Sequence, residues 1–172
     1  MTDQGLWCEG PLPLKWSILD TVATPAAGLE QEALLLLTAI NQMEASHELE
    51  AGGGDQRRLE RMEAKLDLAL YLLARTLEPG PAPVVVAVKL SPEAIRWREP
   101  QPPEEGTPLL LELRPSTALP LSLRLPAMAM APGEGWAQAS FLRLAEPVAE
   151  ALHQFIFRRH RQAIRARQVG TA

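Results

Sequence analysis

The sequence predicts an α+β protein that combines a small antiparallel β-barrel with a helical hairpin and a C-terminal helix. Three observations support this prediction. Residues from Asp55 to Leu77 repeat apolar side chains at alternating spacings of three and four, which is typical of an amphipathic helix. Short apolar segments after Pro83 alternate with polar residues and are separated by proline or glycine, as in antiparallel strands. An apolar stripe between Glu146 and Gln168 predicts a closing helix.

Bulk composition narrows the class of protein. A chain of 172 residues with 47% hydrophobic residues can bury a substantial core, which excludes global disorder. The single cysteine, Cys8, cannot form an internal disulfide, and three scattered histidines offer no metal-binding cluster. No basic leader precedes an apolar run, and no apolar stretch reaches the roughly 20 residues of a membrane helix. We therefore expect a soluble, cytoplasmic protein without membrane insertion, metal or cofactor.

Residues 1–20 are predicted to hold the first strand of the barrel. Leu12, Leu14, Trp16 and Ile18 alternate with more polar or proline positions, which is a half-buried strand pattern. Prolines within this pattern place the start of the strand at an edge or a bend.

Residues 26–78 are predicted to form a helical hairpin. Apolar residues from Leu29 share one face of a first helix and surround its middle, so this helix should be covered on several sides. Gly52 to Gly54 then end the helix, because each glycine costs about 1 kcal/mol relative to alanine in a helix interior. Asp55 is placed to cap a second helix. The two helices should pack antiparallel across this short connection.

The second helix is predicted to associate with copies of itself. At 1.5 Å per residue it is about 34 Å long, longer than one small domain needs for its own core. Its apolar face is wider than a two-stranded contact requires, which favours a helical bundle. We expect a homo-oligomer, either a dimer or a tetramer, and the alternative is a helix packed only inside its own monomer. The residues expected at the interface are Leu59, Met62, Leu66, Ala69, Leu70, Leu73 and Leu77 of the second helix and Leu36, Ile40 and Met43 of the first.

Residues 83–172 are predicted to complete the barrel and to end in the closing helix. Short strands at this spacing favour a small antiparallel barrel. The expected strands are Val84–Leu90, Ile95–Trp97, Leu109–Leu113, Leu119–Met130 and Trp136–Phe141. The apolar stripe of the closing helix is expected to consist of Val148, Leu152, Phe155, Ile156 and Ile164.

Four segments of the second half, VKLSPEAIRW, GTPLLLEL, WAQASFLRL and FIFRRHRQAI, together resemble the PilZ domain. The resemblance covers Val84 to Arg167, and LPLKW near the N-terminus is similar to the first strand of the family. It implies a six-stranded barrel with a terminal helix, in which the helical hairpin is inserted between the first and second strands. It also implies a role in bacterial cyclic di-GMP signalling. The inserted heptads resemble those of non-typical PilZ proteins that assemble into tetramers.

The nucleotide-binding motifs of the PilZ family are degenerate in this sequence. The RxxxR motif expected before the first strand is missing, since no arginine precedes Arg57. KLSPEA stands where the family has DxSxxG, so Lys89 replaces the aspartate, Ser91 remains and Ala94 replaces the glycine. Loss of two arginine contacts to phosphate removes charged hydrogen bonds worth about 1.5–3 kcal/mol each. We therefore expect no tight binding of cyclic di-GMP, and a divergent site would use Lys89, Ser91 and arginines such as Arg96 or those of the last helix.

Other chemistry finds little support in the sequence. No Gly-rich phosphate loop, GxSxG motif or HExxH motif is present, so no catalytic residue is assigned and an enzyme is not expected. A basic cluster in the last helix offers a docking surface for an acidic partner, or else complements the helix macrodipole. Its members are Arg158, Arg159, Arg161 and Arg165. The net charge of −4 and the absence of an aromatic platform near this cluster argue against nucleic acid.

The residues and the resemblance together support one leading hypothesis. It is an oligomeric, non-enzymatic PilZ-like adaptor in bacterial cyclic di-GMP-related signalling or motility, which acts through a protein partner and does not hold the nucleotide itself. One alternative is a cyclic di-GMP effector with a divergent site, and a second is a purely structural assembly protein.

Overall fold

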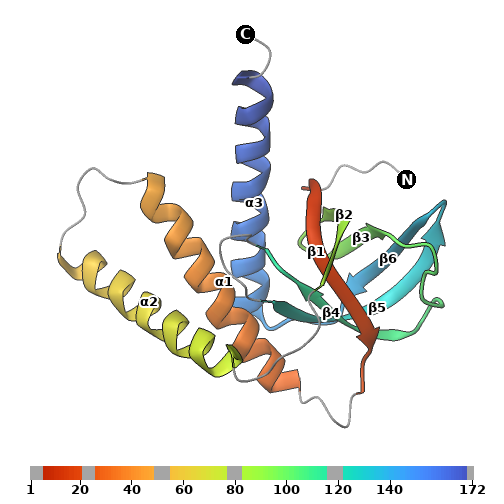
Figure 1. The fold of residues 1–172 in the computed structure, drawn as a ribbon, viewed down its shortest axis with the longest axis horizontal. Helices are drawn as coiled ribbons and strands as arrows, with labels where there is room; N and C mark the ends of the chain where they lie inside the picture. The colour runs from red at the N-terminus through yellow and green to blue at the C-terminus, as the bar shows by residue number, and fades with distance from the viewer. Residues whose placement is uncertain (1–5, 21–25, 49–54, 77–82, 116–121, 170–172) are drawn as a thin grey trace.

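The computed structural model describes residues 6–20, 26–48, 55–76, 83–115 and 122–169. It contains six strands and three helices in these ranges (Figure 1). In chain order the elements are β1 (Cys8–Ile18), α1 (Ala26–Glu48), α2 (Asp55–Thr76), β2 (Val84–Leu90), β3 (Ala94–Arg98), β4 (Pro108–Leu113), β5 (Leu123–Gly133), β6 (Trp136–Phe141) and α3 (Glu146–Val169).

The six strands form a closed antiparallel barrel in the order β1-β2-β3-β6-β5-β4. Closure depends on β1, which pairs with β2 from Cys8 to Leu14 and with β4 from Leu14 to Ile18. A closed barrel leaves no long sheet edge exposed to pairing with other chains. The α+β barrel predicted from the sequence is therefore confirmed, and α1 and α2 lie in the chain between two neighbouring strands of that barrel.

Alternating side chains of the strands fill the barrel interior. The two-residue period of a strand sends every second side chain inward, and these positions carry leucine, isoleucine, valine, alanine and one tryptophan. The most completely buried of them are Val88, Leu90, Ile95, Trp97, Leu109, Leu111, Leu113, Leu123, Leu125, Ala127, Ala129, Ala137 and Ala139. Polar side chains such as Lys89, Arg96 and Gln138 occupy the opposite face of the same strands.

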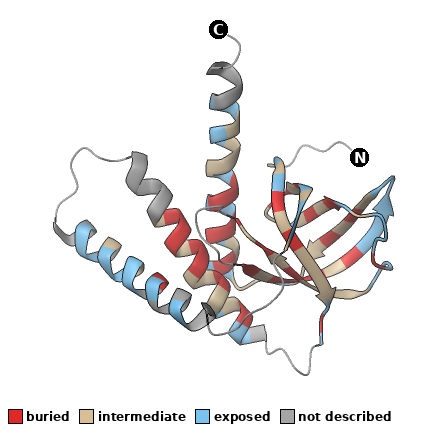
Figure 2. Ribbon diagram, viewed as in Figure 1, coloured by how far each residue is buried: buried red, intermediate tan, exposed pale blue. Residues whose placement is uncertain are grey.

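Helix α1 lies between α2 and α3 and also contacts β5, so it is covered on several sides as predicted (Figures 1 and 2). Leu37 is fully buried at its centre. A charged contact adds to this packing: Arg124 of β5 donates from Nε to Glu32 Oε2 of α1 at 2.8 Å. The Arg124–Glu32 pair therefore connects the barrel to the first helix of the hairpin.

Two residues of α1 require a correction to the predicted interface. Leu36 and Ile40 were expected to take part in self-association, but they are only 1% and 2% exposed. Both belong to the core that α1 shares with the barrel and α3. A helix that is apolar on all sides can be buried within one chain, and the sequence pattern alone does not distinguish that case from an intermolecular contact.

Strand ends differ from the predicted ones by a few residues. Strand β3 begins at Ala94 rather than Ile95, because the turn before it is already closed at Ser91 by a backbone hydrogen bond of 2.8 Å to Ala94. Strand β5 begins at Leu123 and continues to Gly133, beyond Met130. The earlier start predicted at Leu119 falls outside the described residues.

Candidate functional site

Three basic residues line the outer face of β2 and β3. Ile95 and Trp97 of β3 point into the barrel, so the alternation of the strand turns Arg96 and Arg98 outward. The strand register places Lys89 of β2 directly beside Arg96. We call Lys89, Arg96 and Arg98 the basic face. The structure therefore brings together two of the three residues named for a divergent nucleotide site.

Each member of the basic face is engaged by a neighbour. Lys89 Nζ lies 3.5 Å from Glu9 Oε1 of β1. Arg96 Nε donates to Gln138 Oε1 at 3.1 Å, and its guanidinium lies 4.9 Å from the ring centre of Trp7. Arg98 stacks on the ring of Trp136 at 4.5 Å, and Lys89 Nζ lies 5.6 Å from the same ring. The face is therefore a set of cation–π and ion-pair contacts rather than a row of uncommitted donors.

The two indole partners of the basic face were not predicted. The position of Trp7 follows from α3, because His160 Nδ1 lies 2.9 Å from the Trp7 carbonyl oxygen. This contact joins residues at opposite ends of the chain, so no local sequence pattern predicts it.

Ser91 is not presented to a ligand. It is 3% exposed, and its hydroxyl donates to the Ala94 carbonyl oxygen at 3.1 Å while accepting from the Ala94 N–H at 3.0 Å. Among the described residues positive φ angles occur only at Gly106 and Gly135, so the turn before β3 contains none. The hydroxyl of Ser91 thus closes a turn on itself, and the alanine at the family's glycine position keeps an ordinary backbone conformation.

A stripe of apolar side chains lies on the surface of α2. Helix α2 packs against α1 through Leu68, which is 4% exposed and belongs to the shared core. Much of the described part of α2 is coloured as exposed in Figure 2. Leu59, Met62, Leu66 and Leu73 lie on a different side of the helix and are 60%, 60%, 62% and 65% exposed. Ala69 between them is exposed as well. We call these five residues the α2 stripe; Leu77 and the side chains of Leu70 and Met43 lie outside the described part of the chain.

Packing within the protomer accounts for part of the arginine cluster of α3. Arg158 donates to the carbonyl oxygen of Asn41 in α1, and Arg159 donates to that of Pro115 after β4. Arg161 stacks on Phe157 at 5.8 Å and is exposed, as is Arg165. The first two arginines therefore attach α3 to its neighbours.

Cys8 of β1 is buried, and this burial raises the pKa of its thiol; nearby Arg159 partly offsets the rise. As pH rises, the unfolded chain releases the thiol proton at about pH 8.5, whereas the folded chain keeps it to a higher pH. Because the folded state then binds more protons, the free energy of unfolding should fall as pH rises above about 8.5.

Urea unfolding of the wild type and of Cys8→Ala, each at about pH 8 and about pH 10, tests this effect. Between the two pH values the wild type should lose more of its free energy of unfolding than Cys8→Ala does. Equal losses in both proteins would contradict the effect of the buried thiol.

Two further features bear on the kind of site. The described residues contain no group of three or more His, Cys, Asp or Glu side chains arranged to hold a metal ion. No helix in the described ranges combines the length and the apolar character that crossing a bilayer requires.

A closed six-stranded antiparallel barrel followed by a C-terminal helix is the architecture that the resemblance to PilZ domains implies. The family model described as "Atypical PilZ domain, cyclic di-GMP receptor" matches residues 34–168. This chain belongs to that atypical PilZ family. The match begins inside α1, so β1 lies outside it.

A solved structure extends the comparison to nearly the whole chain. It is a tetrameric PilZ domain from Xanthomonas campestris, described as a pathogenic protein that self-assembles through an unusual helical bundle. It is 30% identical in sequence, with a TM-score of 0.72 over 95% of this chain and 92% of that chain. No curated protein matches the chain.

Proposed function

We propose that this chain is an oligomeric PilZ-domain adaptor that self-associates through α2 and does not bind cyclic di-GMP tightly. The observation that carries the proposal is the α2 stripe, whose large side chains are 60–65% exposed in the protomer. A soluble helix does not ordinarily leave so many large apolar side chains on one line of its surface. The tetrameric assembly of the Xanthomonas campestris relative through a helical bundle supports the same use of the inserted helices.

Burial of the α2 stripe would contribute a free energy of the size that association requires. Fully burying one exposed leucine or methionine contributes about 1.5–3 kcal/mol. Because the four large side chains are 60–65% exposed in the protomer, two stripes would contribute about 7–15 kcal/mol, against an association cost of about 4–15 kcal/mol. A bundle of more helices would bury the wide apolar face more completely and add to this contribution.

The geometry of the former nucleotide motifs supports the second half of the proposal. Ser91 is committed to its own turn, and Lys89 is paired with Glu9. Arg96 is held between Gln138 and the ring of Trp7. A phosphate would have to displace these partners, and lysine does not reproduce the bidentate fork of arginine. We infer an adaptor role in bacterial cyclic di-GMP-related signalling or motility, in which a protein partner binds the assembled oligomer.

A divergent cyclic di-GMP site is the alternative. It is favoured by the family description as a receptor and by the presence of three cations and two indoles on one face of the barrel. Indole rings can stack on guanine bases, and the cations can approach phosphates.

Calorimetric titration with cyclic di-GMP separates the proposal from this alternative. We expect no saturable heat at low micromolar nucleotide, because the loss of two arginine contacts weakens binding by about 100-fold or more. Saturable binding in that range would favour the divergent site, and Arg96→Ala should then remove it. Arg143→Ala, which changes an exposed arginine after β6, is the matched control and should leave such binding unaltered.

A further inference from the structure

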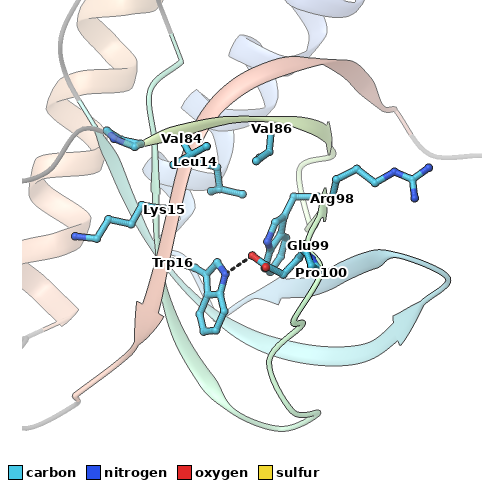
Figure 3. Close-up of a pocket in the computed structure, with 10 residues that line it drawn as sticks. Leu14, Lys15, Trp16, Val84, Val86, Arg98, Glu99 and Pro100 are labelled. Carbon is cyan, nitrogen blue, oxygen red and sulfur yellow. Dashed lines mark hydrogen bonds between the residues drawn. The ribbon is translucent and has the colours of Figure 1, made fainter.

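The barrel wall opens between β2 and β3 at the end away from the Ser91–Ala94 turn. Strand β2 pairs with β3 only from Val88 to Leu90, whereas the described pairing of Val84 to Ala87 is with β1 alone. A cavity of about 430 Å³ lies at this opening (Figure 3). Small-molecule sites commonly measure roughly 300–1,000 Å³, so the cavity has the size of a ligand site.

The cavity combines an apolar wall with two indoles. Leu14 of β1 and Val84 and Val86 of β2 supply aliphatic surface, the half-buried Trp16 supplies aromatic surface, and Trp97 is buried in the wall of the cavity. Trp97 is 1% exposed, and its Nε1–H has no hydrogen-bond partner among the described residues. A buried N–H without an acceptor is uncommon in folded proteins, and an oxygen atom of a ligand would satisfy it.

Glu99 brings a negative charge to the same cavity. Its Oε2 accepts from Trp16 Nε1 at 2.8 Å (Figure 3). Its Oε1 accepts from the Gln101 N–H at 3.3 Å. Both donors are neutral, and no ion pair of Glu99 occurs within the described ranges. The carboxylate is therefore held in place while its charge is left uncompensated.

The two cations that line the cavity are directed elsewhere. Lys15 Nζ lies 3.7 Å from Glu112 Oε1 on β4, and its side chain points away from Glu99 (Figure 3). The guanidinium of Arg98 stacks on Trp136 at 4.5 Å and contacts the carbonyl oxygens of Glu134 and Gly135. Near the indoles the cavity is thus left with a single carboxylate.

We propose that this cavity binds a small organic ammonium ion that carries a hydrogen-bonding oxygen beside an apolar body. Aromatic rings and a carboxylate together recognise such cations, because the ring faces and the carboxylate are both electron-rich. The oxygen would accept from the Trp97 N–H, and the apolar body would pack against Leu14, Val84 and Val86. The site shares Arg98 with the basic face but contains no residue of the α2 stripe.

Choline and its uncharged carbon isostere, neohexyl alcohol, form a matched pair of probes. Both have the same shape and a hydroxyl group, and only choline carries the charge. NMR titration of the full chain should show saturable shifts of the Trp16 and Trp97 indole N–H signals with choline. Neohexyl alcohol should bind about tenfold more weakly, in keeping with the strength of a desolvated cation–π contact.

Glu99→Gln tests the carboxylate, because the amide oxygen can still accept from Trp16 while the charge is removed. We expect this variant to lose the preference for choline over neohexyl alcohol. Glu104→Gln, in the exposed loop before β4, should retain it. Equal binding of the two probes by the wild type, or no saturable shift with choline, would overturn the proposal without reference to any variant.

Discussion

The double substitution Leu66→Lys and Leu73→Lys is expected to convert the assembled protein into monomers. Each leucine that is buried in a helical bundle contributes about 1.5–3 kcal/mol, so losing two weakens association by about 100-fold or more. Lysines on adjoining helices would also repel one another. Both positions are more than 60% exposed in the protomer, so the fold itself should persist. Light scattering should give a multiple of 18.9 kDa for the wild type and 18.9 kDa for the variant.

Glu105→Lys is the control for this experiment. Glu105 is exposed in the loop before β4, outside α2, and the variant also introduces a lysine. Exposed ion pairs are worth only about 1 kcal/mol or less, so its mass should equal that of the wild type. An unchanged mass in the double variant would show that α2 is not the interface, and a monomeric wild type would refute self-association altogether.

Phe155→Ala is expected to have the largest effect on stability. Phe155 of α3 is fully buried in the core shared with α1 and the barrel. Truncating a buried phenylalanine leaves a cavity and typically costs about 3–5 kcal/mol. For a chain of this size such a loss corresponds to a fall in Tm of about 6–20 °C, which differential scanning calorimetry can measure.

Phe157→Ala provides the comparison from the same helix. Phe157 is only two residues away but is 47% exposed, with Arg161 stacked on its ring. Its removal should cost about 1 kcal/mol or less. Similar losses in the two variants would contradict the assignment of Phe155 to the inner face of α3.

Most of the fold could be predicted because its elements have strong local signals. The β-branched run from Val84 to Leu90 is bounded by breakers, and the structure has a strand with the same bounds. The heptads of α2 and the stripe of α3 are similarly local patterns. The sequence could not place Leu36 and Ile40 in the protomer core rather than at the interface between chains. Helix α1 is apolar on nearly every side, and periodicity does not identify which neighbour covers each face.

The candidate sites were only partly predictable. Lys89 could be named from a degenerate motif and Arg96 as an arginine close to it, but Glu9, Trp7 and Trp136 reach them through strand pairing and through α3. The cavity near Glu99 is set by the point at which β2 separates from β3. Such contacts depend on the register of distant segments, which a single sequence does not encode in any short pattern.

The divided pairing of β1 has a consequence for the order of folding during synthesis. Leu14 must meet Val84 of β2 and Leu113 of β4, so the barrel cannot close until most of the chain has left the ribosome. The contacts between α1 and α2 are local and form sooner, since short loops close faster than long ones. We therefore expect the hairpin of α1 and α2 to form on the nascent chain before the barrel does. Two chains can then associate through their hairpins before either barrel has closed.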